Sequence, residues 1–198
     1  DGVDLVLGAS EKFNLDLFIE KRNKEKISKT YSCSIDSFKD FNSSFSDTNS
    51  SRTRSFLKIQ DGCDYKCTYC TIPLARGQSR SDSIQNVLKN VKKIVSKGFK
   101  EIVLTGINLG DYGNFNGKLK KKNSGLINLL NKLENISGVI RYRISSIEPN
   151  LLSDEIIEFV SHSKKFLPHF HIPLQSGSDQ VLRDMKRRYN SSFYSNLI

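Results

Sequence analysis

Three cysteines in one short segment are the residues of this chain best suited to chemistry. They form a C-x3-C-x2-C pattern at Cys63, Cys67 and Cys70. Three thiolates on one loop can hold three irons of a four-iron cluster and leave the fourth iron open to a substrate. Disulfides need well-separated partners with suitable geometry. A tight, odd-numbered group therefore predicts a metal or cofactor site in a reducing compartment.

Zinc is the main alternative occupant of this loop. A closed zinc site uses four ligands, usually as two separated pairs. Only Cys33 and three histidines remain outside the loop, and none lies in a paired motif. Electron carriers usually give every iron a protein ligand, and three cysteines are one short of that number. A zinc-binding or electron-carrier module is thus the non-enzymatic alternative, and Cys33 is assigned no role.

Polar residues follow three further strand-like segments. A glycine at a strand end lets the backbone approach a ligand closely. Hydroxyl and amide groups before a helix suit a ribose or a carboxylate. Each group also has a plainer interpretation, as a simple turn, a strand cap or a helix cap. The candidate cofactor-binding residues are Thr105, Gly106, Asn108, Ser146, Glu148, Gln175 and Ser176.

Strands and helices that could position these residues alternate four times. The expected strands are Phe56–Gln60, Glu101–Thr105, Arg141–Ile147 and Phe170–Leu174. The expected helices begin at Ser81, Leu126, Ser153 and Ser178, and the last of them runs to about Arg188. Such alternation predicts an α/β fold of parallel βαβ units, either an open sheet or part of a barrel. In both, chemistry takes place at the carboxyl ends of the strands.

The first fifty residues have a different character. A short strand, Val3–Leu7, precedes a helix from Glu11 to about Lys21, which Ser10 is expected to cap. Ser43–Ser51 is rich in Ser, Asn and Asp and has the composition of a linker. The chain opens on Asp1 rather than Met, so we expect a fragment that begins with the end of an upstream domain.

Charge favours an anionic partner. The formal net charge is +10, as expected for a protein that binds nucleic acid, although an ordinary basic surface gives the same total. Candidate phosphate contacts are Arg76 and Arg80 beside the cysteine loop, with Lys118–Lys122 and Lys186–Arg188 as further basic runs. No stretch approaches the roughly 18 apolar residues of a membrane helix, so no membrane partner is expected.

The cysteine pattern, with Tyr69 before its last cysteine, resembles the radical S-adenosylmethionine (SAM) superfamily. The resemblance implies a [4Fe–4S] cluster held by three cysteines and by S-adenosylmethionine, which is cleaved to a 5′-deoxyadenosyl radical. It implies that the Thr105–Asn108 turn holds the methionine end of the cofactor, and that Tyr69 packs beside the cluster or the adenine. Packing without a cofactor role is the alternative for Tyr69.

A narrower resemblance is to the methylthiotransferases. It is carried by Phe56–Arg80, Leu104–Gly110, Arg143–Asn150 and His169–Asp179, which read FLKIQDGCDYKCTYCTIPLARGQSR, LTGINLG, RISSIEPN and HFHIPLQSGSD. RTRSFLKIQDGCDYKCTYCTIPLARG and RISSIEPN are closest to the branch that acts on N6-threonylcarbamoyladenosine at position 37 of tRNA. The branch acting on isopentenyladenosine, the branch acting on a ribosomal protein, and other radical enzymes with a protein or small-molecule substrate are alternatives.

This resemblance also implies an organisation and partners. Residues 1–30 would end the methylthiotransferase N-terminal domain, residues 31–52 would be a linker, and residues 53–198 would form a partial (β/α)6 barrel of about four βα units. A second [4Fe–4S] cluster is expected in the missing N-terminal region. The expected partners are tRNA and an electron donor such as flavodoxin or ferredoxin. A cytoplasmic monomer is expected.

Overall fold

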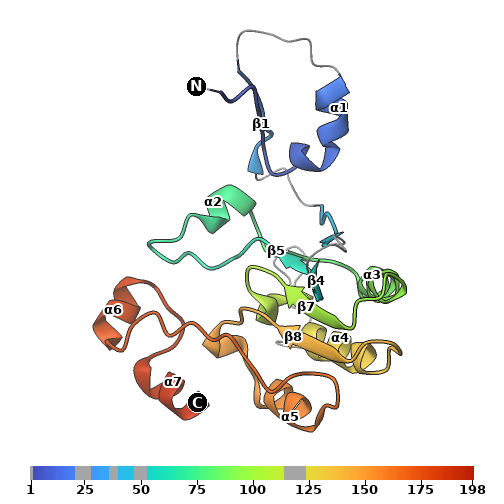
Figure 1. Cartoon of the computed structure of the whole chain (residues 1–198). Coiled ribbons are helices and arrows are strands. Elements are labelled where there is room, and N and C mark those ends of the chain that lie inside the picture. Colours follow the sequence, from blue (N-terminus) through green and yellow to red (C-terminus); the bar gives the residue numbers. More distant parts are fainter. Residues whose placement is uncertain (1, 21–27, 36–39, 47–52, 114–123) are drawn as a thin grey trace.

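A parallel sheet forms the centre of the protein. The computed structural model describes residues 2–20, 28–35, 40–46, 53–113 and 124–198 (Figure 1). The strands lie in the order β3-β4-β7-β8, of which β3 (Ser44–Phe45) is the edge strand. Three of them run parallel, namely β4 (Arg54–Lys58), β7 (Glu101–Thr105) and β8 (Arg141–Ile144). The predicted α/β class is therefore confirmed, and β7 has the predicted bounds.

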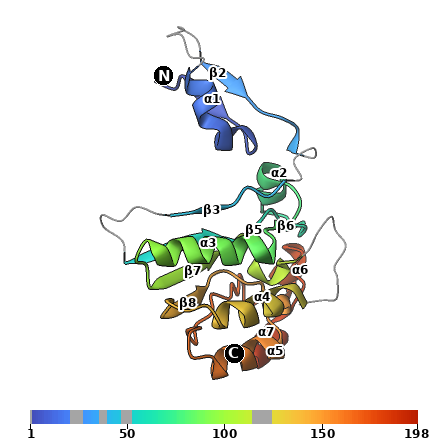
Figure 2. The ribbon, with the colours of Figure 1, turned by 90° about the vertical axis from the view of Figure 1, so that its right-hand side faces the viewer.

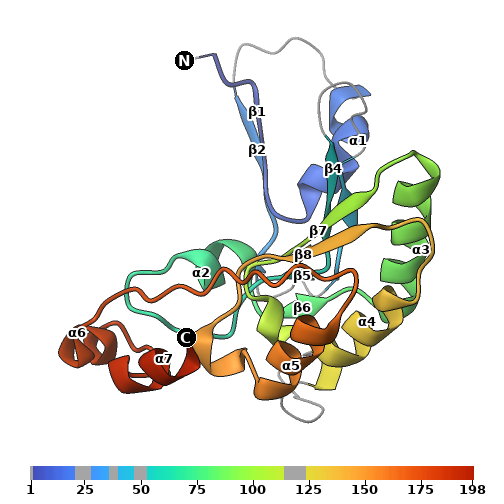
Figure 3. The same ribbon diagram turned by 60° about the horizontal axis from the view of Figure 1, so that its bottom comes forward.

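Three helices cover one side of this sheet (Figures 2 and 3). They are α3 (Ile84–Ser96), α4 (Ser124–Glu134) and α5 (Asp154–His162). In α3 the buried side chains of Val87, Val91 and Ile94 recur at helical spacing and face the strands. They pack with fully buried strand residues such as Leu57 and Leu104, so the core lies between the sheet and these helices.

The cysteine loop lies on a separate small hairpin. Strand β5 (Gln60–Asp61) pairs antiparallel with β6 (Arg80–Ser81). The loop and helix α2 (Ile72–Arg76) connect these two strands. The helix expected to begin at Ser81 instead begins after Ser83, whose hydroxyl accepts the N–H of Asn86, because Ser81 belongs to β6.

The prediction of a fourth strand at Phe170–Leu174 is wrong, because this segment does not form a regular strand. Among the described residues the segment makes one isolated parallel bridge, between His171 and Ser146, and a second such bridge joins the preceding Phe166 to Tyr142 of β8. Pro168 and Pro173 have no N–H to donate, which interrupts a ladder here.

The third predicted strand is shorter than expected, since it ends at Ile144 and does not reach Ile147. Short 3₁₀ helices follow the ends of β7 and β8, at Leu109–Asp111 (η3) and Pro149–Leu151 (η4).

The last helical region is divided. Helix α6 (Asp179–Asp184) ends before the expected Arg188, and α7 (Ser191–Leu197) was not predicted. Ser178 caps α6 as expected, since its hydroxyl accepts the N–H of Val181. Ser153 lies at the start of α5 but makes no side-chain capping bond. Figures 1 and 3 place α6 and α2 on the same side of the molecule, away from α3.

The N-terminal part forms a small parallel pair of strands, β1 (Leu5–Leu7) with β2 (Lys29–Tyr31). Between them lie a 3₁₀ helix, η1 (Glu11–Asn14), and α1 (Leu15–Glu20). Ser10 does not cap this helix, because its hydroxyl lies 3.0 Å from the thiol of Cys33.

Part of the expected linker is also structured. Within it, β3 (Ser44–Phe45) pairs antiparallel with β4. The run Lys118–Lys122 lies outside the described residues. Within the described part of the chain, no helix combines the length and apolar character that a membrane crossing requires.

Candidate cluster and cofactor site

The three thiols lie on the loop that leaves β5. Cys67 is buried and packs against the core, and Cys63 and Cys70 are half-buried. Backbone bonds fix the loop, with the N–H of Cys63 donating to Gly77 O at 3.1 Å and that of Cys70 to Cys67 O at 3.1 Å. Burial raises the pKa of Cys63 to about 11, so iron that binds here must displace its proton.

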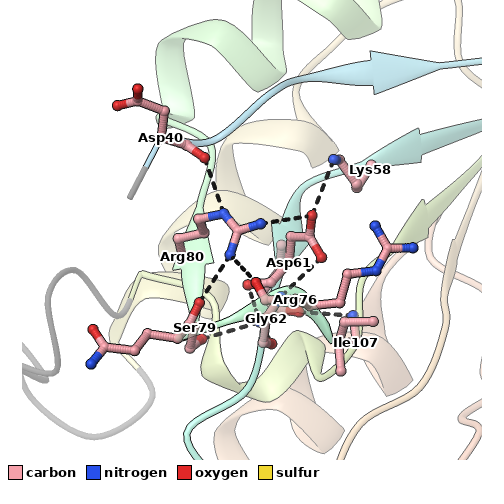
Figure 4. Close-up of polar contacts among 10 residues, drawn as sticks. Asp40, Lys58, Asp61, Gly62, Arg76, Ser79, Arg80 and Ile107 are labelled. Atoms are coloured by element: carbon pink, nitrogen blue, oxygen red, sulfur yellow. Dashed lines mark hydrogen bonds and ion pairs between the residues drawn. The ribbon is translucent and has the colours of Figure 1, made fainter. Parts of the chain in front are cut away.

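A buried ion pair supports the base of the loop (Figure 4). Arg80 Nη2 lies 3.1 Å from Asp61 Oδ2, and both side chains are buried. Lys58 Nζ approaches the same oxygen at 3.4 Å. Arg80 also donates to the backbone oxygens of Asp40, Arg76 and Gln78. The guanidinium of Arg80 is thus engaged inside the protein, which argues against the expected phosphate contact, whereas Arg76 remains partly exposed.

Gln60, which the sequence interpretation did not single out, joins the cysteine loop to the end of β7. Its side chain is fully buried. Nε2 donates to Gly62 O at 2.8 Å and to Ser79 Oγ at 3.1 Å. Oε1 accepts the N–H groups of Ile107 at 2.8 Å and Asn108 at 2.9 Å. A polar residue at the end of an apolar strand was the only signal in the sequence for this role.

The Thr105–Asn108 turn is built around that side chain. A Cβ on Gly106 would lie 2.9 Å from Gln60 Oε1, so the glycine makes room for Gln60. The carbonyl of Thr105 accepts the N–H of Ile59 at 2.9 Å. Asn108 is buried, and its Nδ2 has no partner among the described residues. An unpartnered buried donor at a strand end suits a ligand acceptor.

The end of β8 joins this turn directly. The N–H of Glu148 donates to Asn108 Oδ1 at 3.2 Å. The carbonyl of Ser146 accepts the N–H of Leu109 at 3.0 Å. The structure therefore brings together the predicted residues of the second and third strand ends beside the cysteine loop.

The segment after α6 returns to the cysteine loop. Thr68 donates to the carbonyls of Met185 and Asp184, through its N–H at 3.3 Å and its hydroxyl at 3.0 Å. Arg188 stacks over Tyr65, with its guanidinium carbon 3.8 Å from the ring centre. Arg188, in the predicted basic run Lys186–Arg188, thus contacts the cysteine loop, and phosphate contacts of this run stay a prediction.

Arg187 is the most enclosed of these residues. Its side chain is 2% exposed, and Nη2 is paired with Glu148. Nη1 lies 3.3 Å from Cys67 Sγ and 3.3 Å from the hydroxyl of Tyr69. Burial alone would lower the pKa of Arg187, but the hydrogen bond and charge of Glu148 outweigh it and the pKa is raised. Arg187 is therefore a fixed cation beside a predicted cluster ligand.

The remaining predicted residues are more exposed. Tyr69 is 52% exposed, and its hydroxyl accepts a hydrogen bond from Arg187 Nη1. Gln175 is exposed and has a positive φ of 64°, a strained backbone conformation that is common at functional sites. Ser176 accepts the N–H of Ser178 at 3.1 Å, a local turn bond. Their contacts with a cofactor stay predictions.

This donor set fits an iron–sulfur cluster. The three thiols lie on one loop, with Cys67 buried and Cys63 and Cys70 half-buried. In a four-iron cluster each of three thiolates would bind its own iron and leave the fourth iron open. The unpartnered Nδ2 of Asn108 and the half-open thiols are compatible with a cofactor between the loop and the strand ends.

Comparison with known proteins identifies the family. Residues 57–197 match the Radical SAM superfamily, and the chain belongs to this superfamily. A [4Fe–4S] cluster and S-adenosylmethionine are the cofactors of the family. A radical SAM methyltransferase, TsrM from Kitasatospora setae, shares the fold with a TM-score of 0.57 and 13% identity, over 72% of this chain and 28% of that one.

Several curated relatives are tRNA-modifying enzymes by name. The threonylcarbamoyladenosine tRNA methylthiotransferase MtaB of Bacillus subtilis is 38% identical over 98% of this chain and 42% of its own length. The protein of the same name from Thermotoga maritima is 39% identical over 99% and 43%. The tRNA-2-methylthio-N6-dimethylallyladenosine synthase of Clostridium perfringens is 35% identical over 75% and 32%. The chain thus spans less than half the length of these relatives.

Proposed function

We propose that this chain is the radical-generating part of an enzyme that transfers a methylthio group to C2 of N6-threonylcarbamoyladenosine at position 37 of tRNA. The observation that carries the proposal is the 38% and 39% identity to the two MtaB proteins over 98% and 99% of the chain. The methylthiotransferase name of these relatives agrees with the cysteine loop and the strand-end residues described above.

The residues of the chain have separable tasks in this reaction. When bound, the cluster and S-adenosylmethionine supply one-electron chemistry at a C–H bond that lacks useful acidity. Cys63, Cys67 and Cys70 would ligate three irons and leave one open. Asn108, which is buried with a free amide donor, would orient the cofactor beside them. The chain thereby holds the reactive centre at the carboxyl ends of the strands.

Charge supports tRNA as the substrate. The net charge of +10 favours a polyanion, because lysine and arginine neutralise phosphates. Arg76 ends α2, directly after the cysteine loop, and remains partly exposed. A cation at this position could bind a phosphate close to the nucleoside that reacts.

Dimethylallyladenosine in tRNA is the second candidate substrate. The Clostridium perfringens relative named for that nucleoside matches 148 residues, against 195 and 197 for the two MtaB proteins. The additional matched residues and the higher identity favour threonylcarbamoyladenosine.

The experiment that tests the proposal is deletion of the gene in its source organism. Mass spectrometry of nucleosides from bulk tRNA should show loss of the methylthio form of threonylcarbamoyladenosine, with the unmodified precursor in its place. The wild-type gene should restore the modification, and a Cys67→Ala gene should not. An unchanged nucleoside profile would overturn the assignment, and loss of methylthio-dimethylallyladenosine would favour the second candidate.

The setting of the reaction follows from the same chemistry. We propose a cytoplasmic monomer that receives electrons from a one-electron donor such as flavodoxin or ferredoxin. The four cysteines are all unpaired in the described structure, as a reducing compartment requires. A reduced donor protein that fails to support cleavage of S-adenosylmethionine by the full-length protein would exclude that donor.

A further inference from the structure

Arg187 contacts three groups of the site with one guanidinium. Nη1 lies 3.3 Å from Cys67 Sγ and 3.3 Å from the hydroxyl of Tyr69, while Nη2 is paired with Glu148. The side chain of Arg187 is 2% exposed and that of Glu148 is 16% exposed. A charged donor enclosed in this way interacts strongly with neighbouring charge, because water screens it little.

The backbone that carries Arg187 is set by the end of α6. Lys186 adopts a left-handed conformation with φ 57°. The N–H of Arg187 donates to Leu182 O and that of Lys186 to Arg183 O, both at 2.9 Å. This pattern is a Schellman motif, which ends the helix and reverses the chain. The turn directs Arg187 toward the cysteine loop.

Tyr189 also contacts the guanidinium of Arg187. Its guanidinium carbon lies 5.3 Å from the centre of the Tyr189 ring. The hydroxyl of Tyr189 in turn donates to the carbonyls of Pro173 and Leu174, at 2.8 Å and 3.0 Å. The guanidinium is therefore confined between Glu148, the cysteine loop and Tyr189, and it has little freedom to leave Cys67.

We propose that Arg187 is a positioning residue that withdraws electron density from the thiolate of Cys67 and so raises the reduction potential of the cluster. Hydrogen bonds to ligand sulfurs and local charge are among the factors that set such potentials. A cluster gains negative charge when it accepts an electron, and an adjacent guanidinium stabilises that state. Glu148 offsets part of this charge and fixes the orientation of the guanidinium.

The proposal depends on the cluster of the family and not on which nucleoside is modified. Four variants of the full-length protein, reconstituted anaerobically with iron and sulfide, separate charge from structure. Arg187→Gln removes the cation, and Arg187→Lys keeps it. Glu148→Gln removes the opposing charge. Arg188→Gln is the matched control, because Arg188 lies next in the chain and stacks on Tyr65 of the same loop without a thiolate contact.

The measurement is a redox titration followed by electron paramagnetic resonance, without S-adenosylmethionine. The relevant signal is the one that a Cys67→Ala variant lacks. Arg187→Gln should lower the potential, so that the reduced-to-oxidised ratio at a fixed solution potential falls about tenfold, equivalent to about 59 mV for one electron. Arg187→Lys should recover part of the shift, and Glu148→Gln should shift the potential in the opposite direction. Arg188→Gln should match the wild type.

Two results would overturn the proposal. One is a wild-type potential in Arg187→Gln with its full iron content. The other is an equal shift in Arg187→Gln and Arg188→Gln, which would mean that loosening the loop is sufficient. If Arg187→Gln does not retain iron, Arg187→Lys and Glu148→Gln decide the matter, since wild-type potentials in both would also overturn it.

Discussion

The side-chain oxygen of Gln60 accepts the backbone N–H of Asn108 at 2.9 Å, across 48 residues of sequence. The same amide holds Gly62 at the start of the cysteine loop. One buried side chain therefore fixes the position of the loop relative to the end of β7. The cysteine loop is expected to hold the cluster and the end of β7 the cofactor, so this side chain sets how the two lie relative to each other.

Gln60→Leu tests that link. The substitution leaves the half-buried N–H of Ile107 and the buried N–H of Asn108 without an acceptor, and each such loss costs about 1–3 kcal/mol. We expect the free energy of unfolding to fall by about 3 kcal/mol in chemical denaturation. Gln78→Leu, on the exposed edge of the same hairpin, should change it by less than about 0.5 kcal/mol. Equal effects of the two substitutions would contradict the role of Gln60.

Gly62 and Gly98 have similar left-handed backbone conformations, with φ of 72° and 89°, but different surroundings. A Cβ on Gly62 would overlap the backbone oxygen of Gln78, whereas one on Gly98 meets nothing within 4 Å. Gly98→Ala should cost about 1 kcal/mol through its left-handed backbone alone. Gly62→Ala should cost more than about 3 kcal/mol, because overlap with backbone adds to the same strain. Thermal unfolding distinguishes them, and similar melting temperatures would refute the argument.

Cys67→Ala should abolish assembly of the cluster that the loop holds. Cys67 is the buried one of the three predicted ligands, and its loss would leave two. Iron and sulfide analysis after anaerobic reconstitution should show the loss, while far-ultraviolet circular dichroism stays close to wild type. Cys33→Ala is the control and should keep the full iron content, since Cys33 lies near the N-terminal strands, where its thiol is 3.0 Å from the hydroxyl of Ser10. Full iron in Cys67→Ala would count against the ligand assignment.

Arg76 and Arg80 should behave differently despite their proximity. Arg80→Ala leaves Asp61 buried with only Lys58 as a cation, and we expect a loss of about 3 kcal/mol in unfolding free energy. Arg76→Ala should leave stability near wild type. It should weaken tRNA binding by the full-length protein and reduce the slope of log affinity against log salt by about 1. An unchanged slope would remove Arg76 from the proposed tRNA surface.

Lys186→Gly should stabilise the protein. Lysine occupies a left-handed position at the end of α6, where glycine has no steric penalty, so a gain of about 0.5–1 kcal/mol is expected. Lys92→Gly, at an exposed site within α3, should instead cost about 1 kcal/mol. Chemical denaturation measures both changes. A destabilised Lys186→Gly would show that the lysine side chain itself contributes.

The sequence pattern predicted elements whose apolar spacing is regular. Strand β7 and helices α4 and α5 lie where periodicity placed them, because burial between sheet and helices requires that spacing. Phe170–Leu174 has the same strand-like pattern, yet strand pairing depends on a neighbour that the pattern does not specify. Local apolar character alone does not distinguish a ladder strand from an extended segment.

The site was predictable only where its residues are close together in the sequence. The cysteine spacing is local, so the cysteine loop could be identified directly. Arg187 was grouped with surface phosphate contacts because its neighbours are basic. Its actual partner, Glu148, lies 39 residues away in sequence. A buried guanidinium needs a carboxylate, but only the fold shows which carboxylate is close enough.

The bonds from Thr68 to the end of α6 have a consequence for biosynthesis. They join positions 116 or more residues apart, so the cysteine loop leaves the ribosome long before its partner segment exists. Domains generally acquire structure as they are synthesised, from the N-terminus onward. In a nascent chain the three cysteines are therefore present without the Arg187 guanidinium until the last tenth of this sequence has been synthesised. The loop therefore acquires its contacts with the end of α6 only after the sheet strands have been synthesised.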